Sequence, residues 1–303
     1  MTIEITRVPE VSGEQERRVA FHSFVNVLHV VRGELDELEE IVGKPALFAD
    51  HRSTIDRIVE SFGALEQVQR LASEINDLAD NIKEAIDTRL LPVVKGNPAV
   101  ELRVEGELDF LEEVFEIAET RVDEILFRYQ ADGPWARLAP HDIESSLQEV
   151  FLVMAAKGDY GVVFVSDEQT ESDYLIDFNV VGDQNGTLLI PHELQDVARD
   201  LLANARKYSK PGSTCTLAFT GGGDLVRLVV TDQGRGIPEG EIEDVVAYGV
   251  RGSNVGEKET MGGGFGLTKA YQVTTRHGGR MWIESQLGSG TTVTIEIPVP
   301  PDL

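Results

Sequence analysis

Cysteine is almost absent from these 303 residues, and long apolar runs are missing altogether. The single cysteine, Cys215, excludes an internal disulfide and fits a reducing compartment. It lies in a run of alternating apolar and polar residues, which predicts a buried structural thiol rather than a reactive one. The stretch 1–15 lacks an apolar signal core, and no apolar run approaches the roughly 20 residues that span a bilayer. We therefore expect a cytoplasmic protein without membrane insertion.

Basic residues are also scarce, since 27 lysines and arginines stand against 53 aspartates and glutamates, for a net charge of −26. A surface this acidic repels phosphate backbones and anionic lipids, so we expect neither nucleic acid nor a membrane surface as a partner. The same acidity also serves plain solubility. Apolar residues make up 41% of the chain, and its length suffices for two domains with a core in each.

Apolar residues recur every three or four positions through the N-terminal half, which is the spacing of one helix face. This periodicity predicts four helices, at about 14–43, 51–90, 105–130 and 141–157. The second pattern is long enough to be typical of a bundle or coiled-coil helix, and it favours a homodimer. We expect residues 1–157 to form a helical bundle, made within one chain or completed by a second copy.

From about residue 158 the pattern becomes strand-like, and glycines crowd the stretch 232–266. We expect 158–303 to be an α/β sandwich of one sheet against a helical layer, which makes the whole chain α+β. The predicted strands are 162–165, 174–181, 214–220, 225–231, 280–285 and 291–297, with helices over 191–208 and from about 267.

The helix over 191–208 carries the first of three candidate ligand-binding segments. At about 100° per residue, Asp200, Asn204 and Lys207 fall within one narrow arc beside an apolar arc. Carboxylate and amide oxygens suit Mg²⁺, and an ammonium group suits phosphate. Taken alone, the pattern fits an ordinary solvated helix face equally well.

Two glycine-rich segments follow. In the first, Asp232 ends a strand and precedes Gly234 and Gly236, so its carboxylate can accept a hydrogen bond while the glycines let a ligand approach the backbone. The second runs from Gly262 through Gly264 and Gly266 to Leu267 and opens a helix, where free backbone N–H groups can bind an anion. Each segment alone is weak, because many turns look alike.

Together, in this order and spacing, the three segments resemble the N, G1 and G2 boxes of the GHKL ATPases, the superfamily of histidine kinases, gyrase and MutL. Gly288-Ser289-Gly290-Thr291-Thr292 with the following strand resembles the C-terminal strand pair of the kinase domain. The resemblance covers about 159–300 and implies ATP and Mg²⁺ as ligands.

The resemblance also implies roles for single residues. By this resemblance, Asn204 would coordinate Mg²⁺, Lys207 would contact phosphate and Asp232 would recognise adenine, and 238–261 would be the mobile ATP lid. Asp200 stands where gyrase-like members carry a glutamate base, and Tyr248 matches the aromatic residue of the F box only loosely. The remaining residues that we assign to the nucleotide site are Tyr208, Gly234, Gly236, Arg251, Gly262, Gly264, Gly266, Leu267 and Thr291.

The helix over 14–43 has an apolar side and an opposite polar side. His22, Asn26, His29 and Gly33 cluster on the polar side, so these histidines are not expected in the core. A plain surface histidine remains an alternative on the pattern alone. The apolar side carries Phe21, Phe24, Leu28, Val31, Leu35 and Val42.

The segment from His22 to Leu28 resembles the H box of two-component histidine kinases, which implies that His22 accepts phosphate from ATP. The phosphate would pass to an aspartate on a response-regulator receiver domain. Ser23 stands where the family usually has an acidic residue, whereas Asn26 keeps the position that orients water in dephosphorylation. His29 is the alternative acceptor on the same face.

The expected function is therefore an ATP-dependent protein histidine kinase in which His22, Asn26 and Asp200 are the catalytic residues, and phosphatase activity is left open as an addition. Two alternatives stay open at this point. One is an ATP-gated binding module without kinase turnover, which the serine after His22 favours. The other is a Ser/Thr protein kinase of the anti-sigma-factor type, which shares the same fold.

Overall fold

The protein is described here by a computed structural model of residues 2–61, 65–130, 133–156, 162–164, 173–255 and 263–303. The chain forms two compact units, of which one comprises Met1–Val19 with Gly133–Leu303 and the other Ala20–Asp132. Within the described ranges, no helix is both long and apolar enough to cross a bilayer. The division between the two units falls at residue 132, whereas we expected a domain boundary at 157.

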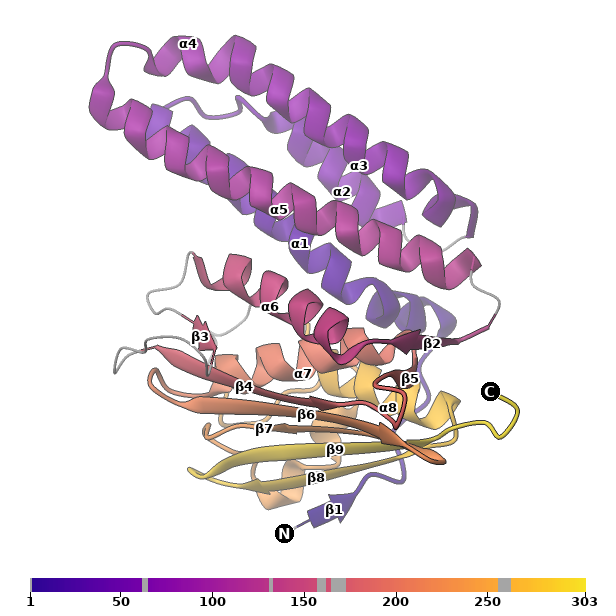
Figure 1. The fold of residues 1–303 in the computed structure, drawn as a ribbon. Coiled ribbons are helices and arrows are strands. Elements are labelled where there is room, and N and C mark those ends of the chain that lie inside the picture. Colours follow the sequence, from indigo (N-terminus) through magenta and orange to yellow (C-terminus); the bar gives the residue numbers. More distant parts are fainter. Residues whose placement is uncertain (1, 62–64, 131–132, 157–161, 165–172, 256–262) are drawn as a thin grey trace. The chain divides into compact units, whose positions relative to one another are not determined.

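The first unit is built on a seven-stranded sheet, ordered β1-β8-β9-β7-β6-β4-β3 (Figure 1). The β3–β4 and β4–β6 pairs are parallel, and all other neighbours are antiparallel. A separate antiparallel pair joins β2 (Trp135–Leu138) to β5 (Leu188–Pro191). The strands of the main sheet are β1 (Thr2–Glu4), β3 (Val162–Phe164), β4 (Tyr174–Val181), β6 (Thr214–Gly222), β7 (Leu225–Thr231), β8 (Arg280–Gln286) and β9 (Gly290–Pro298).

Three helices cover one face of this sheet: α6 (Pro140–Ala156), α7 (Leu194–Tyr208) and α8 (Gly266–Arg276) (Figure 1). Inward residues alternate along the strands, as at Leu217 and Phe219 of β6, and both side chains are fully buried. Burying one such side chain contributes about 1.5–3 kcal/mol. The helical layer against one sheet confirms the predicted sandwich.

The expected strands and helices of this unit are all present, with bounds that differ by a few residues. Cys215 is buried as expected, and burial raises the pKa of its thiol to about 11. The sequence pattern missed β1, β2 and β5, because strands of three or four residues carry too little alternation to be recognised. Two contacts between Arg280 and Glu4, at 2.6 and 2.7 Å, hold β1 beside β8.

Helix α6 needs a correction, because we expected it in the helical region. Its residues Ile143, Leu147 and Phe151 instead belong to the same apolar core as the sheet and α7. Apolar periodicity indicates that a helix buries one face, but it does not indicate which neighbouring element covers that face.

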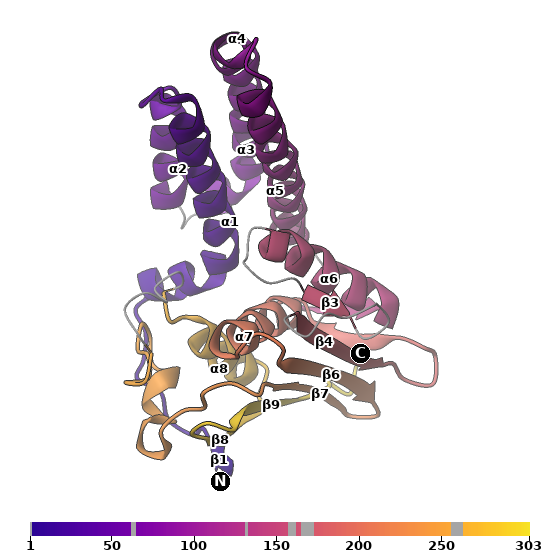
Figure 2. The same ribbon diagram turned by 90° about the vertical axis from the view of Figure 1, so that its left-hand side faces the viewer.

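The second unit consists of helices, described by themselves (Figures 1 and 2). Their inward residues include Leu28 and Leu35 on α1, Ile55 on α2 and Ile75 on α3, all fully buried. The helices are α1 (Gly13–Val42), which begins in the first unit, α2 (Ala49–Ser61), α3 (Leu65–Ala85), the π turn η1 (Ile86–Leu90), α4 (Leu91–Val94) and α5 (Pro98–Gln130).

The single long helix expected over 51–90 is wrong. Helix α2 ends at Ser61 and α3 begins at Leu65. Residues 62–64 lie outside the described residues, and the apolar spacing of the sequence runs on from one helix to the next. Beyond α3, helical structure continues through η1 past Pro92, which lies in the first turn of α4 where its missing N–H is tolerated.

Polar contacts close the turn between α1 and α2. The carboxylate of Glu39 accepts hydrogen bonds from the backbone N–H of Phe48 at 2.7 Å and of Ala46 at 3.1 Å. Arg52 on α2 lies 2.9 Å from both Glu39 and Asp36. Burial alone would raise the pKa of Glu39, but these backbone and guanidinium contacts lower it below its usual range.

Candidate functional site

The carboxylate of Asp232, directly after β7, is held by backbone groups. Its Oδ1 accepts hydrogen bonds from the N–H of Gly234 at 2.7 Å and of Thr291 at 3.1 Å. The backbone N–H of Asp232 in turn donates to the carbonyl of Thr291 at 2.9 Å. Burial raises the pKa of Asp232, although the two N–H groups oppose the shift. Within the described part of the chain Oδ2 accepts no hydrogen bond, so it is the oxygen left for a ligand.

Three glycines let the backbone pack tightly around Asp232. A Cβ on Gly234 would lie 2.5 Å from the carbonyl oxygen of Tyr208, and one on Gly290 would lie 1.9 Å from that of Asp232. Gly236 has φ +69°, and its Cβ would lie 2.1 Å from the carbonyl oxygen of Gln286. A side chain at these positions would collide with the backbone at the end of α7, the end of β8 or the loop after β7.

Helices α7 and α8 meet at Asn204 and Gly266. A Cβ on Gly266 would lie 2.7 Å from Nδ2 of Asn204 and 3.5 Å from Cβ of Asp200. Gly264 has φ +73° and turns the chain into α8. The first-turn N–H groups of α8 therefore begin beside an amide side chain. This combination of donors and an oxygen ligand fits a phosphate group with Mg²⁺. Gly262 lies outside the described residues.

Tyr208, at the end of α7, links this helix to the loop after β7. Its carbonyl accepts a hydrogen bond from the N–H of Arg235 at 3.1 Å. The Arg235 guanidinium carbon lies 5.8 Å from the centroid of the Tyr208 ring, and Nζ of Lys207 lies 5.6 Å from it. Two cations therefore flank one aromatic ring at the edge of the candidate site.

The described part of the expected ATP lid is tied to the loop after β7. Asn254 donates from Nδ2 to the carbonyl of Gly236 at 2.8 Å, and its own carbonyl accepts from Arg235 at 3.0 Å. Tyr248 stacks on Phe265 with ring centroids 4.7 Å apart, which joins this segment to the residue before α8. The segment contains the 3-10 turns η2 (Glu239–Glu241) and η3 (Asp244–Val246) and the half-buried Arg251, while 256–261 lie outside the described residues.

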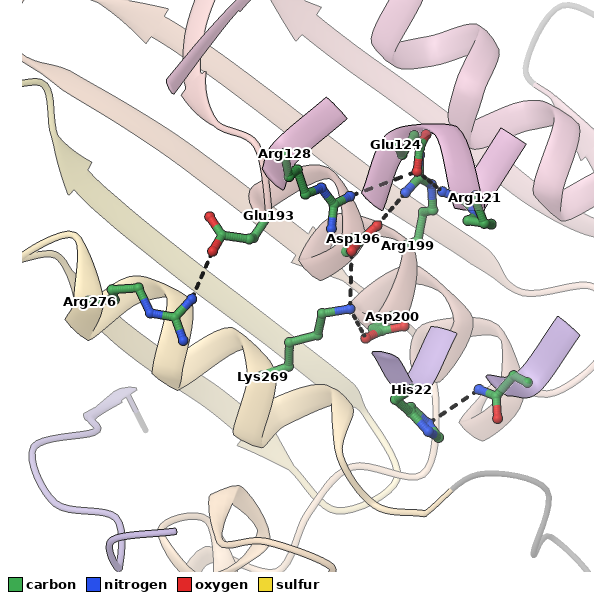
Figure 3. A network of polar contacts seen from close by, with 11 residues as sticks. His22, Arg121, Glu124, Arg128, Glu193, Asp196, Arg199, Asp200, Lys269 and Arg276 are labelled. Atoms are coloured by element: carbon green, nitrogen blue, oxygen red, sulfur yellow. Dashed lines mark hydrogen bonds and ion pairs between the residues drawn. The ribbon is translucent and has the colours of Figure 1, made fainter. Parts of the chain in front are cut away.

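The structure also reveals charged neighbours of Asp200 that the sequence analysis missed. Lys269 on α8 reaches Asp200 and Asp196 on α7, and Arg199 pairs with Asp196 (Figure 3). The spacing of Asp196, Arg199 and Asp200 puts them on neighbouring parts of one helix face, which was a usable signal. The approach of Lys269 was not readable, because it depends on how α7 and α8 pack.

His22 lies on α1 together with Asn26. The side-chain Nδ2 of Asn26 is 3.2 Å from Nε2 of His22, a contact drawn as a dashed line from His22 in Figure 3. Both residues are half-buried. An amide nitrogen donates, so Nε2 accepts in this contact. The neighbouring Phe24 is fully buried and His29 is exposed, which confirms the two predicted sides of the helix.

Comparison with known proteins then decides what kind of domain surrounds Asp232 and Asn204. The sequence profile of the family described as "Histidine kinase-, DNA gyrase B-, and HSP90-like ATPase" matches residues 190–301. The C-terminal part of this chain is a histidine kinase-type ATPase domain. The match contains all three segments that carried the resemblance, from α7 to β9 of the kinase-type ATPase domain.

Curated relatives of the ATPase domain are sensor kinases. The chain is 34% identical over 122 residues to the adaptive-response sensory kinase SasA of Synechococcus elongatus, covering 40% of this chain and 31% of SasA. It is 35% identical over 108 residues to the histidine protein kinase DivJ of Caulobacter vibrioides, covering 35% of this chain and 18% of DivJ. The chain thus spans about a third or less of the length of these relatives.

Solved structures of histidine kinases are also similar. The mycobacterial sensor histidine kinase MprB has 22% identity and a TM-score of 0.38, with 54% of this chain and 96% of that chain covered. Full-length ShkA in complex with AMPPNP has 17% identity and a TM-score of 0.46, with 78% of this chain and 46% of that chain covered.

Proposed function

We propose that this chain is an ATP-dependent protein histidine kinase that phosphorylates His22 and passes the phosphoryl group to an aspartate of a response-regulator receiver domain. The observation that carries the proposal is the approach of Gly266, at the start of α8, to Asn204 on α7 within a histidine kinase-type ATPase domain. Because this approach needs a glycine, it fits a helix start that leaves room for phosphate.

In this proposal each part of the site has one task. Oδ2 of Asp232 accepts a hydrogen bond from the amino group of adenine. Asn204 provides an oxygen ligand for Mg²⁺, and Lys207 neutralises negative charge on the phosphates. Bound Mg²⁺ would spread the negative charge of the triphosphate. The N–H groups at the start of α8, with Gly264 and Leu267 beside them, receive the phosphate oxygens.

The phosphoryl transfer proposed for His22 is an in-line displacement. A bond forms between Nε2 and the γ-phosphorus as the bond from that phosphorus to the β–γ bridging oxygen breaks, and ADP leaves with the electron pair. Attack needs the lone pair on Nε2, and the contact with Asn26 fits an unprotonated Nε2; the Asn26 amide would turn away as the new bond forms. A receiver aspartate would then take the phosphoryl group and regenerate the imidazole.

We also propose a homodimer through the helical unit.

Labelled ATP tests the acceptor assignment. We expect the parent chain to acquire phosphate that is labile in acid and stable in base, as phosphohistidine is, and we expect His22→Ala to abolish it. His29→Ala is the matched control, since His29 lies on the same helix and is exposed. Label that survives in His22→Ala and disappears in His29→Ala would move the acceptor to His29.

One observation favours a second candidate, an ATP-gated binding module without turnover. Ser23 follows His22, so the adjacent acidic group that would help to deprotonate the histidine is missing. Tight ATP binding without any phosphoprotein, even with the receiver partner supplied, would favour the module. Acid-stable phosphoserine on the partner would instead indicate a Ser/Thr protein kinase.

A further inference from the structure

Lys269 lies in a cluster of four charged side chains between α7 and α8 (Figure 3). Its Nζ is 3.3 Å from Oδ2 of Asp200 and 3.5 Å from Oδ2 of Asp196. Nη1 of Arg199 lies 2.6 Å from Oδ1 of Asp196, and its Nη2 donates to Oγ of Ser146 on α6 at 2.7 Å. The side chains of Lys269, Asp196 and Arg199 are 4% exposed and that of Asp200 is 12% exposed.

A buried cluster of this kind is not needed for packing. The neighbours of Lys269 on α8, Ala270 and Val273, belong to the apolar core, and an apolar side chain at 269 would extend that core. Taking an ammonium group out of water is costly unless carboxylates compensate it. Each of the four charged groups lies within 4.0 Å of an opposite charge, which is the arrangement that makes burial tolerable.

Within the cluster, Lys269 is the residue that compensates the negative charge of Asp200. Arg199 is engaged by Asp196 and Ser146. In the described ranges of the chain, Lys269 is the one cation within 4.0 Å of the Asp200 carboxylate. The contact is an ion pair rather than a directional hydrogen bond, so its main effect is to cancel charge.

This charge lies next to the proposed phosphate site. Asp200 precedes Asn204 by one helical turn, and both face Gly266 at the start of α8. A carboxylate without compensation at that place would repel a ligand with several negative charges. We infer that Lys269 is a positioning residue, which holds and neutralises Asp200 so that the site accepts a nucleoside triphosphate. The inference rests on the proposed ATP site.

Ligands that differ in negative charge test this inference. We compare the Kd values of adenosine, ADP and ATP, with Mg²⁺ present, for the full chain and for Lys269→Met. We expect Lys269→Met to weaken ATP about tenfold, ADP less, and adenosine less than twofold, because repulsion by one uncompensated charge grows with ligand charge. Arg227→Met is the matched control, since it removes one cation from an exposed ion pair on β7. The double variant Asp200→Asn/Lys269→Met should regain most of the ATP affinity.

Equal losses for adenosine and ATP, or a double variant no better than Lys269→Met, would overturn the inference. Circular dichroism shows whether Lys269→Met folds. If it does not, the single variant Asp200→Asn provides the test instead. It should bind ATP at least as tightly as the parent chain, and weaker binding contradicts the inference. A parent chain that binds no ATP refutes the proposed function itself, whereas ATP binding without the charge-graded loss refutes the inference alone.

Discussion

Gly266, the first residue of α8, lies so close to Asn204 on α7 that a Cβ would come within 2.7 Å of the amide nitrogen. The two residues are 62 positions apart in the sequence (266 − 204). Their approach brings a helix start and an amide side chain together, which makes the glycine a direct probe of the site.

Gly266→Ala should weaken ATP binding while sparing the fold. The added methyl group meets the end of the Asn204 side chain, which can turn away, so we expect a loss of about tenfold in ATP affinity and less than about 1 kcal/mol in the free energy of unfolding. Calorimetric titration with a non-hydrolysable ATP analogue and urea unfolding measure the two effects. Gly222→Ala is the control, because nothing lies within 4 Å of its Cβ. Equal ATP affinity in both variants would contradict the expectation.

Gly236→Ala should instead unfold the domain. Its Cβ would lie 2.1 Å from the carbonyl oxygen of Gln286, a backbone atom that cannot turn away, and its φ is +69°. We expect a loss of more than about 3 kcal/mol in urea unfolding. Gly223→Ala shares the positive φ of +65° in open space and should cost only about 1 kcal/mol. Similar losses in the two variants would mean that the backbone clash is relieved by movement.

Asp232→Asn should remove adenine recognition rather than phosphate recognition. Oδ1 of Asp232 accepts from Gly234 and Thr291, and an amide group cannot keep both bonds and also offer a second acceptor oxygen. We therefore expect adenosine and ATP to weaken alike, by about tenfold or more in Kd. The exposed Asp224, in the turn between β6 and β7, gives the control Asp224→Asn. Loss of ATP binding with unchanged adenosine binding would place Asp232 at the phosphates.

The stability of the sheet unit should depend on acid pH through Glu193. Burial alone would raise the pKa of its carboxyl, but the contact with His277, whose Nε2 lies 3.5 Å from Oε2, and the charge of Arg276 lower it from 4.5 to about 2. A lowered pKa stabilises the folded chain above pH 4.5, and this contribution is lost as the pH falls from 4.5 toward 2. The shift corresponds to at most roughly 3 kcal/mol.

Unfolding free energies of the parent chain and Glu193→Gln, measured between pH 2 and 6, check this contribution. The difference between the two proteins should be largest at pH 6 and should vanish near pH 2. Arg276, whose Nη1 lies 2.7 Å from Glu193, gives a second variant, Arg276→Met. The free energy of unfolding of this variant should fall less between pH 6 and pH 2 than that of the parent chain. A difference that stays constant with pH would show that Glu193 acts through packing alone.

Much of the ATPase domain could be predicted from local patterns. A hairpin was predicted from the alternation in 214–220 and 225–231 and from the glycines between them. The structure contains it as β6 and β7. The glycines at 234, 236, 264 and 266 marked places where the backbone approaches other groups, because few other residues tolerate such crowding. Local patterns failed to separate α2 from α3, since the apolar spacing of the sequence runs on from one helix to the next.

The sequence by itself determined the longer strands and the helices α7 and α8 of the sheet unit, and which segments meet at a candidate nucleotide site, because periodicity and glycine placement are local properties. Only the tertiary structure decided that α6 packs on the sheet and that Lys269 pairs with Asp200 across two helices. Those two outcomes depend on which buried faces and charges meet. Such meetings are set by the packing of segments far apart in the chain, and no local pattern encodes them.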